Sequence, residues 1–584
     1  MSASNKFQQA DFLPVCKDDL KKRGWKECDF IFVSGDAYVD HPSFATALIC
    51  RALEAEGFRV GIIPQPNWKD TSSYTVLGRP RLGFLVGAGN MDSMVAHYTA
   101  AKRKRSDDAY SPGGKSCLRP DRATLVYTEG IRRAYKDTGQ SRIAVIIGGI
   151  EASLRRFAHY DYWSDNVRRS ILLDSKADIL VYGMGEKPLL QIAQRLAAGE
   201  SISSIQNVKG TNIRVHGRDS IAKWNEAVLL PAYEKIKDKD EGSLRAYAEH
   251  FILQKQNADP LTAKPLAEEN DGDRWVIQNP PIIPLTTEEM DKLYELPFTR
   301  KAHPMYKEGI NALKEVSFSL ISSRGCFGGC SFCAITNHQG RAITGRSKES
   351  LMREAQKLIK DKDFKGYIHD VGGPTANFFR PACDRQKSGG FCTERECLYP
   401  APCPKLKADH SEYLKTLEAL RKIPGIKKVF IRSGIRFDFI QYDKKTGSVF
   451  LETIVKNHVS GQLKAAPEHV SVNVLNAMGK CSIECYEKFK NDFTQLNKKL
   501  GLKQYLLPYF ISAHPGADLK EAEELAKYCK KTGFTPEQTQ EFYPTPGTIS
   551  TVMYYTGLDP RSMKPIYTAK GDKERRRQKE LLIK

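Results

Sequence analysis

The sequence predicts an α/β protein in which a Rossmann-like N-terminal domain precedes a partial (β/α)6 barrel of the TIM type. Short apolar segments alternate with helical patterns in both halves of the chain, which is typical of parallel sheets covered by helices. Glycine or polar residues follow the predicted strands, at the sheet edge where ligands usually bind. Between the two halves, residues 255–311 are rich in proline and charge and predict a linker with extended pieces.

The N-terminal domain is predicted over residues 1–254. Residues 29–64 predict a strand, a helix and a second strand, because Phe44, Leu48 and Leu53 recur at helical spacing between two apolar runs. Further short apolar strands are predicted at residues 81–89, 142–150 and 177–185. A parallel sheet with helices on its faces follows from this alternation.

One stretch of this domain, residues 148–170, is crowded with arginine, histidine and aromatic residues directly after a predicted strand. Arg155, Arg156 and Tyr160 belong to it. Such a stretch suits either a cationic and aromatic ligand face or a segment that packs its aromatic rings inward. We favour the packing interpretation.

The barrel is predicted over residues 312–560. Helical patterns separate its strands, as in residues 347–361, where Leu351, Ala355 and Leu358 share one face. A barrel of this kind carries its active site at the C-terminal ends of its strands. Six strand candidates are found at residues 315–323, 365–373, 427–434, 461–468, 503–513 and 539–547. After the barrel, we expect residues 561–584 to form an exposed basic tail.

The composition of the chain indicates which partners and which cellular compartment to expect. The 90 Lys and Arg residues exceed the 69 Asp and Glu residues by 21, and this positive charge favours polyanions such as RNA or simply a solvated surface. No apolar run approaches the ~20 residues of a membrane span, and the first 29 residues lack a signal-peptide core. We therefore expect a cytoplasmic protein, whose thiols stay reduced and whose clustered cysteines bind metal.

The first cysteine group has the spacing C-x3-C-x2-C and directly follows the first barrel strand. Three thiolates in one loop can hold three irons of a cluster and leave the fourth iron open to a ligand. Three glycines let such a loop wrap closely around its metal. The alternative is a structural zinc ion held by the three thiolates with His338 or a distant residue. The group consists of Cys326, Cys330 and Cys333, and the glycines are Gly325, Gly328 and Gly329.

The second cysteine group has the spacing C-x8-C-x4-C-x5-C and lies in an insertion after the second barrel strand, residues 383–403. Four thiolates could hold a zinc ion or an auxiliary iron–sulfur cluster, and a structural zinc is worth roughly 10–16 kcal/mol of apparent binding energy. We favour the auxiliary cluster slightly over zinc, and metal over a chance clustering. The four residues are Cys383, Cys392, Cys397 and Cys403.

The first group resembles the signature of the radical S-adenosylmethionine (SAM) superfamily, in which C-x3-C-x-aromatic-C follows the first strand of a βα barrel. The whole chain, including residues 148–163 and 300–306, resembles the YgiQ-type family of that superfamily. The resemblance implies that Cys326, Cys330 and Cys333 hold a [4Fe–4S] cluster whose open iron chelates SAM. One electron, supplied by a donor such as flavodoxin or ferredoxin, then cleaves SAM to give a 5′-deoxyadenosyl radical.

The resemblance also implies residues that bind the cofactor. Phe332 would pack near the adenine, and the pair Gly372 and Gly373 would meet the methionyl amino group, although Pro374 replaces the more usual glutamate. Glu468 occupies the acidic position of the fourth strand. Any of Arg432, Ser433 and Arg436 could meet the carboxylate or the ribose, and the resemblance does not choose among them, although we count Arg436 among the cofactor-binding residues.

A Rossmann-like domain ahead of a radical SAM barrel also resembles the cobalamin-binding arrangement, and residues 147–153 and 178–186 look like the corresponding strand ends. However, the lower-axial motif D-x-H-x-x-G is absent, and His41 follows Asp40 without that spacing. We favour a domain that binds substrate or packs on the barrel over one that binds cobalamin.

Two classes of function follow. The first is a radical SAM enzyme that cleaves SAM and modifies an unknown substrate, with RNA as one candidate. The second is a metal-containing nucleic-acid-binding protein, with zinc or an iron–sulfur cluster and without turnover. The glycine pair and the barrel favour the enzyme, because a binding module needs neither.

Overall fold

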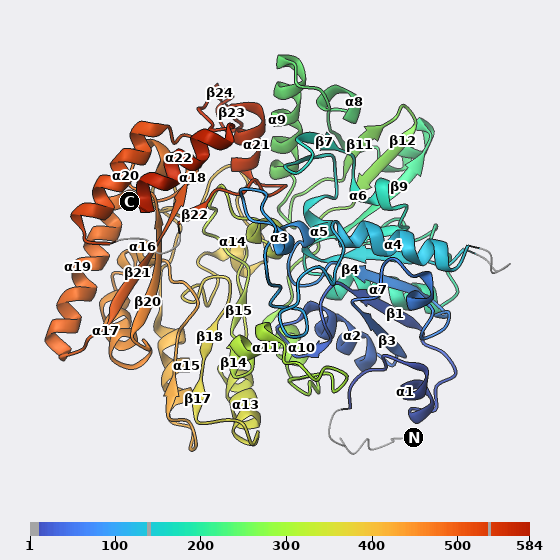
Figure 1. The fold of residues 1–584 in the computed structure, drawn as a ribbon, viewed down its shortest axis with the longest axis horizontal. Coiled ribbons are helices and arrows are strands. Elements are labelled where there is room, and N and C mark those ends of the chain that lie inside the picture. Colours follow the sequence, from blue (N-terminus) through green and yellow to red (C-terminus); the bar gives the residue numbers. More distant parts are fainter. Residues whose placement is uncertain (1–10, 137–141, 535–538, 584) are drawn as a thin grey trace.

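The computed structural model of the chain describes residues 11–136, 142–534 and 539–583, and it confirms the predicted α/β class. The two halves of the chain lie side by side, with the N-terminal sheet on one side and the C-terminal strands and helices on the other (Figure 1). Residues 1–10 and residue 584, which we assigned to the N-terminal domain and to the tail, lie outside the described residues.

The N-terminal half is built on one nine-stranded sheet with the order β10-β11-β12-β9-β8-β5-β4-β1-β3. Within it, β3-β1-β4-β5-β8 are parallel. Strand β3 follows β1 in the chain but lies at the edge of the sheet, on the opposite side of β1 from β4, as in doubly wound folds. All five of these strands fall within segments predicted from the sequence. They are β1 (Phe30–Ser34), β3 (Val60–Pro64), β4 (Gly83–Gly87), β5 (Val145–Gly148) and β8 (Ile179–Val181).

Helices cover both faces of this sheet because successive residues of each strand point to opposite sides. In β1, Phe30 packs into the cluster formed with α2 (Ala45–Ala55) and α7 (Glu186–Ala197). Its neighbour Ile31 packs into the opposite cluster, formed with α4 (Ala123–Ala134) and α6 (Ile171–Ser175). A near-continuous apolar strand is therefore buried on both sides.

Within the segment predicted as a linker with extended pieces, residues 255–311, residues 266–278 belong to the N-terminal sheet. These residues form the hairpin β11 (Leu266–Asn270) and β12 (Arg274–Gln278), which joins the sheet through β9 (Thr211–His216) and β10 (Val228–Leu229). The charged residues of β11 suggested an exposed segment. However, Glu268 is fully buried, and its Oε2 lies 2.7 Å from His250 Nε2. A buried, paired carboxylate gives no hydrophobic signal in the sequence.

Other parts of the expected linker are also ordered elements. Helix α10 (Thr287–Tyr294) begins with a capping box of Thr286 and Glu289. Two further short elements are β13 (Lys301–Ala302), which pairs antiparallel with β2 (Val39–Asp40), and helix α11 (Asn311–Val316). The segment thus connects the two halves by contacts with both of them.

The C-terminal half contains a strand at each of the six predicted places. Strands β14 and β18 pair in parallel, as do β17 and β19, and β20-β21-β22 form a parallel three-stranded sheet. A parallel bridge between Ile435 and Ala465 connects the two parts. The bounds are β14 (Ser319–Ile321), β17 (Tyr367–Ile368), β18 (Asp370–Gly372), β19 (Lys428–Val429), β20 (Gln462–Glu468), β21 (Tyr505–Ser512) and β22 (Gln540–Glu541).

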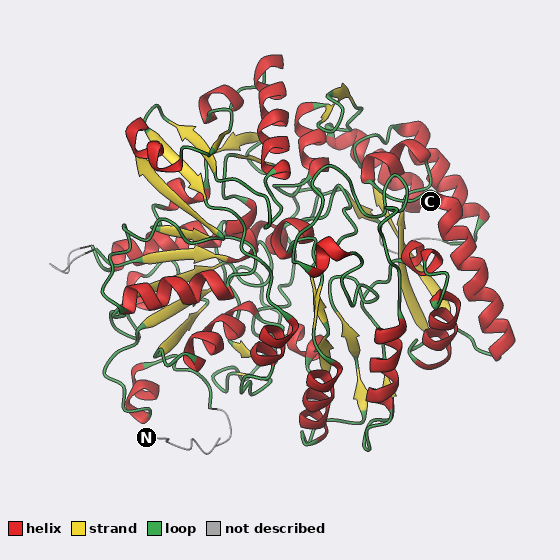
Figure 2. Ribbon diagram, turned by 180° about the vertical axis from the view of Figure 1, so that it is seen from behind, coloured by secondary structure: helices red, strands yellow, loops and turns green. Residues whose placement is uncertain are grey.

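Helices pack on the outer side of these strands, as the view from behind shows (Figure 2). Leu351 and Leu358 of the helix over 348–359 are buried against strand residues such as Ile368. The alternation of strand and helix confirms the partial barrel. The outer helices are α13 (Lys348–Ile359), α15 (Ser411–Arg421), α17 (Gly447–Asn457), α19 (Ile483–Leu500) and α20 (Leu519–Lys531).

The expected exposed tail is wrong for residues 572–583, which form helix α22 (Asp572–Ile583) against the body of the protein. Arg575 is 2% exposed, forms an ion pair with Glu541 at 2.8 Å and donates a hydrogen bond to Tyr162 Oη at 2.6 Å. One arginine of this basic segment is therefore buried, and it connects the C-terminal helix to the N-terminal half through a hydrogen bond.

The aromatic stretch 148–170 packs inward, as we favoured. The ring of Tyr160 stacks on that of Tyr555 with a centroid distance of 4.6 Å. Tyr555 belongs to α21 (Ile549–Thr556), which also packs on α9 (Glu241–Gln256). These rings form part of the contact between the two halves.

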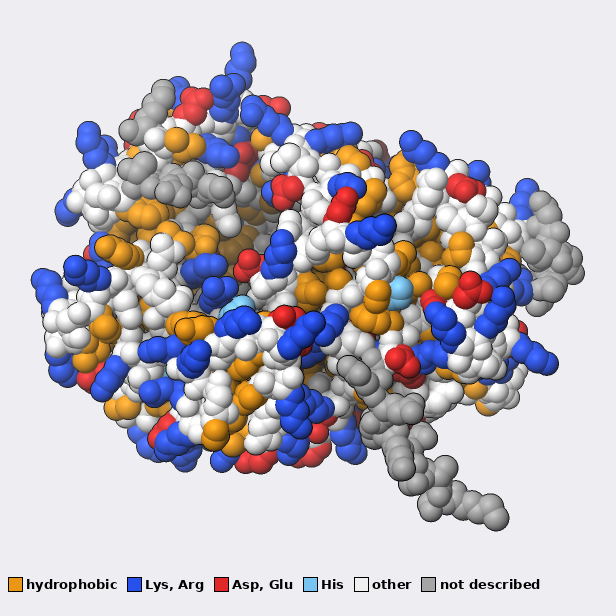
Figure 3. Space-filling view, turned by 60° about the horizontal axis from the view of Figure 1, so that its bottom comes forward, with side chains coloured by type: hydrophobic (Ala, Val, Ile, Leu, Met, Phe, Trp, Pro, Cys, Tyr) orange, Lys and Arg blue, Asp and Glu red, His pale blue; other side chains and the backbone are white. Residues whose placement is uncertain are grey.

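The surface carries the positive charge expected from composition. Figure 3 shows Lys and Arg side chains spread over one face, with fewer Asp and Glu side chains among them. Among the helices of the described ranges, none is both long and apolar enough to cross a membrane.

Candidate functional site

The first cysteine group lies in a loop between β15 (Ser323–Arg324) and α12 (Ile335–Gln339), at the C-terminal ends of the barrel strands. Backbone bonds fix this loop from two sides. The Ser331 N–H donates to Met478 O at 2.9 Å, and Ser331 O accepts from the Ser550 N–H at 2.9 Å. The loop is therefore anchored across the barrel mouth.

The three glycines of the loop are required by space and conformation. Gly325 has φ 84° and its added Cβ would lie 2.1 Å from Ala342 O, and Gly329 has φ 64° with Glu396 Oε2 at 2.2 Å. Gly328 is needed for close approach, since a Cβ there would lie 2.8 Å from Arg436 Nη1. Any other residue would force the loop away from its neighbours.

The three thiols of the loop lie close enough to influence one another. Burial, followed by the neighbouring Cys330 and Cys326, raises the pKa of Cys333 to about 12. Burial and then Cys330 likewise raise the pKa of Cys326. Within the described ranges, however, no three His, Cys, Asp or Glu side chains form a group that could hold a metal ion. The thiols are thus neighbours rather than a finished ligand set.

Arg436 supplies a buried positive charge beside these thiols. Its Nη1 donates to Cys330 Sγ at 3.4 Å, and its Nε donates to Asp438 Oδ1 at 2.9 Å. Burial would lower the pKa of Arg436, but Asp438 outweighs it and holds that pKa well above its usual value. Arg436 therefore places a positive charge directly against the Cys330 sulfur.

Replacing Arg436 by Met is expected to destabilise the barrel by about 3–5 kcal/mol, because it leaves the fully buried Asp438 without its partner. The double variant Arg436→Met/Asp438→Leu should recover most of that loss. Arg432→Met is the matched control, since Arg432 is 48% exposed and 3.7 Å from Glu315. Urea denaturation measures all three. Equal midpoints for Arg436→Met and Arg432→Met would contradict this assignment.

Gly372 and Gly373 lie at the end of β18, where three strand ends approach one another. A Cβ on Gly373 would lie 2.5 Å from Ser323 O, and one on Gly372 would lie 2.4 Å from Ser433 Oγ. Ser433 is itself held by a hydrogen bond to Asp370. The two alternatives to Arg436 as a cofactor-binding residue are Ser433 and Arg432. The hydroxyl of Ser433 already donates its hydrogen bond to Asp370, and Arg432 is exposed at the surface.

Glu468 ends β20 in a strained conformation, with φ 72°. It is 8% exposed, and Lys480 Nζ lies 3.8 Å from its Oε1. Burial raises the pKa of Glu468, while Lys480 and Arg436 lower it. Glu468 is also among the charges that act on Cys333, so it belongs to the same neighbourhood as the thiols.

Phe332 lies between the last two cysteines of the loop and packs toward the other side of the barrel. Its ring meets His514 edge to face at 5.9 Å. His514 Nε2 lies 2.6 Å from Ser550 Oγ, at the start of α21. The aromatic residue therefore helps to hold the loop against the end of the fifth barrel strand, β21.

The second cysteine group lies beside the first. Burial raises the pKa of Cys397 to about 11, with Arg341 lowering it and Cys383, Glu396 and Cys392 raising it further. The Cys403 N–H donates to Cys397 O at 2.8 Å. Cys326 and Cys397 pack against the same apolar cluster around Phe327 and Phe378. The insertion is thus folded against the cysteine loop.

The zinc alternative for the first group used His338, which the structure places elsewhere. His338 Nδ1 lies 3.1 Å from Ser153 Oγ of the N-terminal half. Burial lowers the pKa of His338 to about 4, with Glu186 raising it and Arg324 and Arg156 lowering it again. His338 therefore faces the N-terminal sheet.

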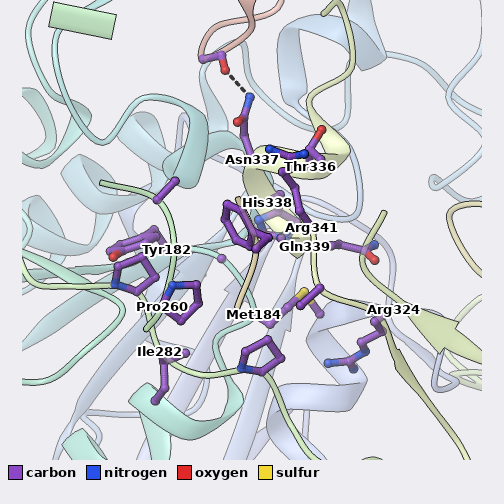
Figure 4. A pocket seen from close by; sticks show the side chains of 18 of the residues that line it. Tyr182, Met184, Pro260, Ile282, Arg324, Thr336, Asn337, His338, Gln339 and Arg341 are labelled. Atoms are coloured by element: carbon purple, nitrogen blue, oxygen red, sulfur yellow. Dashed lines mark hydrogen bonds between the residues drawn. The ribbon is translucent and has the colours of Figure 1, made fainter. Parts of the chain in front are cut away.

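A cavity of about 180 Å³ lies between the cysteine loop and the C-terminal edge of the N-terminal sheet. Cys330 and Cys333 line one side, and residues after β8, including Tyr182 and Met184, line the other. Figure 4 shows α12 above it, with Asn337 hydrogen-bonded to Gly547 O. We call it the interdomain cavity. Sequence analysis did not predict it.

The cavity contains residues that sequence analysis missed, because they come from distant segments. Arg324 and Glu186 are 138 positions apart yet form a buried ion pair of 2.8 Å. The glycine-rich strand end before Glu186 was the only signal. His41, weighed as a cobalamin ligand, is fully buried, and its Nδ1 accepts from the Ser43 N–H at 3.0 Å. It is not among the residues lining the cavity.

Comparison with known proteins identifies the class. The profile of a family described as Radical SAM N-terminal matches residues 12–319, and that of a domain of unknown function matches residues 537–583. With the barrel and its cysteine loop, this match defines a radical SAM enzyme. Our alternative, a nucleic-acid-binding protein without turnover, is not favoured.

The particular family follows from close relatives. A UPF0313 protein of Clostridium botulinum (strain ATCC 19397 / Type A) is 53% identical over 574 residues, 98% of this chain and 87% of that protein. A UPF0313 protein of Clostridium perfringens (strain 13 / Type A) is 50% identical over 573 residues, 98% of this chain and 84% of that protein. The chain belongs to the UPF0313 family, which is the predicted YgiQ-type family.

Two solved structures are similar at a lower level. TsrM of Kitasatospora setae, a radical S-adenosylmethionine methyltransferase with cobalamin and a [4Fe–4S] cluster bound, gives a TM-score of 0.48 at 13% identity, over 89% of this chain and 74% of that chain. The cobalamin-dependent S-adenosylmethionine radical enzyme OxsB gives 0.47 at 12%, over 86% and 52%.

Proposed function

We propose that Cys326, Cys330 and Cys333 hold a [4Fe–4S] cluster whose remaining iron takes SAM. The observation that carries this proposal is the anchored thiol loop at the barrel mouth, with the Arg436 guanidinium against the Cys330 sulfur. The donor set suits the cluster, because iron–sulfur clusters are held by thiolates. When bound, such a cluster supplies the electron that cleaves SAM to the 5′-deoxyadenosyl radical.

The residues around the loop would position the cofactor. Gly372 and Gly373 let a ligand approach the backbone, because neither carries a side chain at the strand end. Arg436 and Glu468 place one buried charge of each sign near the thiols, which suits the carboxylate and amino groups of SAM. Phe332 closes the loop on one side and helps to exclude water.

Anaerobic, reconstituted wild-type protein is expected to form 5′-deoxyadenosine when it is incubated with SAM and dithionite, because reductive cleavage does not require the physiological donor. Liquid chromatography with mass detection measures the product. Omission of dithionite is the control. If reconstituted protein binds iron that the Cys330→Ala variant loses, yet forms no 5′-deoxyadenosine, the proposal is contradicted.

We also propose a second metal site at Cys383, Cys392, Cys397 and Cys403, holding an auxiliary iron–sulfur cluster or zinc. Support comes from the closeness of Cys383 and Cys392 to Cys397, whose pKa they help to raise, and from the contact between the insertion and the cysteine loop. Arg341 strengthens this contact, since it donates to Cys392 O at 2.7 Å and pairs with Glu396 at 2.6 Å.

The proposed reductive cleavage of SAM indicates which further partners the protein needs. A one-electron donor of the flavodoxin or ferredoxin type is needed, and the cytoplasm is the compartment we propose, because the thiols must stay reduced. RNA, suggested by the net charge of +21, stays a prediction. Cobalamin remains the less favoured cofactor, since His41 is buried away from the interdomain cavity.

A further inference from the structure

The interdomain cavity carries more positive than negative charge. Two carboxylates line it, Glu186 and Glu396. Most of the cations that line it are paired: Arg324 with Glu186 at 2.8 Å, Arg341 and Lys255 with Glu396 at 2.6 and 3.0 Å, and Lys187 with Glu289 at 2.6 Å. The fifth cation is Arg156.

Arg156 has no carboxylate partner among the described residues. Its Nε donates to Gln278 Oε1 at 2.6 Å, and its Nη1 donates to Ser153 O at 2.8 Å. Its guanidinium lies 5.1 Å from the ring centroid of Tyr182, whose hydroxyl is bound to Asn279 O. Burial lowers the pKa of Arg156, and only Tyr182 acts against it. A guanidinium remains charged even so, and a partly buried charge without a counter-ion is costly.

Buried polar atoms around the same cavity also lack partners. Glu186 Oε2, Ser331 Oγ and Arg341 Nε are buried without a hydrogen bond in the described structure. Their residues are 4%, 3% and 7% exposed, and all three line the cavity. Such atoms are normally satisfied in native proteins. Their convergence on one cavity indicates a polar ligand.

Apolar side chains form another large part of the wall. They include Phe251, Pro281, Ile282, Ile283, Pro284 and Ile549. A ligand that satisfied Arg156 and also filled this space would need an anionic group and an apolar body. Because Cys330 and Cys333 form part of the wall, the ligand would lie against the cysteine loop.

We infer that the interdomain cavity binds a small, partly apolar anion whose carboxylate or phosphate group pairs with Arg156. This inference deepens the proposed function, since a ligand beside the cysteine loop is the substrate of the radical chemistry. Arg156 is then a substrate-binding residue, contributed by the N-terminal half to a site whose metal ligands come from the barrel.

Full-length protein is tested with three probes of similar shape: benzoate, benzamide and phenyl phosphate. We expect wild type to bind benzoate at least about tenfold more tightly than neutral benzamide, since only the carboxylate can accept a charge-assisted hydrogen bond from Arg156. Arg156→Gln should weaken benzoate by about the same factor and leave benzamide unchanged. Arg156→Lys should lie between. Ligand-observed NMR gives the affinities.

Arg142→Gln is the control, because Arg142 belongs to the same half, is 55% exposed and lies outside the cavity. Tighter binding of phenyl phosphate than of benzoate would assign a phosphate group, and the reverse a carboxylate. Retained benzamide binding shows that Arg156→Gln is folded, and Arg156→Lys serves if it is not. No preference for the anions in wild type, or equal effects of Arg156→Gln and Arg142→Gln, would overturn the inference.

The binding test needs no turnover, so the two proposals can fail separately. Protein that prefers anions through Arg156 but forms no 5′-deoxyadenosine contradicts the proposed function alone. Protein that forms 5′-deoxyadenosine but shows no anion preference contradicts this inference alone.

Discussion

Cys330→Ala is expected to reduce 5′-deoxyadenosine formation to background. Loss of residues that merely orient a metal ligand typically costs 10–100-fold, so loss of a ligand itself should exceed about 100-fold. Cys330 is the thiol that Arg436 contacts at 3.4 Å, so its loss also removes the hydrogen-bonded sulfur. The iron content after reconstitution should fall together with the activity.

Cys485→Ala is the matched control for this prediction. Cys485 lies in the same barrel, is partly buried and donates to Gln441 Oε1 at 3.2 Å, away from the cysteine loop. We expect this variant to keep its iron and to form 5′-deoxyadenosine. If Cys330→Ala stays as active as Cys485→Ala, the cluster is not held where we place it.

Cys397→Ser is expected to remove the metal of the second site and to unfold the insertion around it. Between β18 and α15 the described chain has only one regular element, the four-residue helix α14 (Asp384–Lys387). A segment with so little core gains most from a metal, for which roughly 10–16 kcal/mol is typical of structural zinc. Metal analysis per chain and limited proteolysis measure the two effects.

The identity of the lost metal decides between the two alternatives for this site. Loss of iron and sulfide indicates an auxiliary cluster, and loss of zinc indicates a structural ion. Cys529→Ser serves as the control, because Cys529 is 4% exposed and belongs to a different apolar cluster. Unchanged metal content and unchanged proteolysis in Cys397→Ser would show that the insertion folds without metal.

The elements that sequence analysis predicted are those with a strong periodic signal. The strands at all six predicted barrel places and the five parallel N-terminal strands lie within the short segments that we predicted, which are flanked by glycine or polar residues. Such patterns are local, so they are visible without contacts. The cysteine loop could equally be predicted, because its cysteines and its glycines are adjacent in the sequence.

The elements that it missed depend on contacts between distant residues. Strand β11 contains Glu268, which is buried only because His250 pairs with it. Helix α22 contains Arg575, which is buried only because Glu541 and Tyr162 receive it. When only the sequence is known, a charged residue whose partner is far along the chain cannot be distinguished from a surface residue. We therefore predicted a linker and an exposed tail in these places.

The site shows the same division. The choice of Arg436 over Arg432 could not be settled from the sequence, because both follow the third barrel strand within five positions. Only the fold places Arg436 against Cys330. The role of Arg156 required the interdomain cavity, whose wall combines the N-terminal sheet, the linker region and the cysteine loop.

The central claim is that the three-cysteine loop holds a cluster with one iron open to SAM. The most direct measurement is electron–nuclear double resonance of the reduced cluster in Cys397→Ser protein, with SAM labelled at its amino nitrogen and carboxylate oxygen. We predict couplings from both labels to the cluster. An identical cluster spectrum with and without labelled SAM would contradict the account.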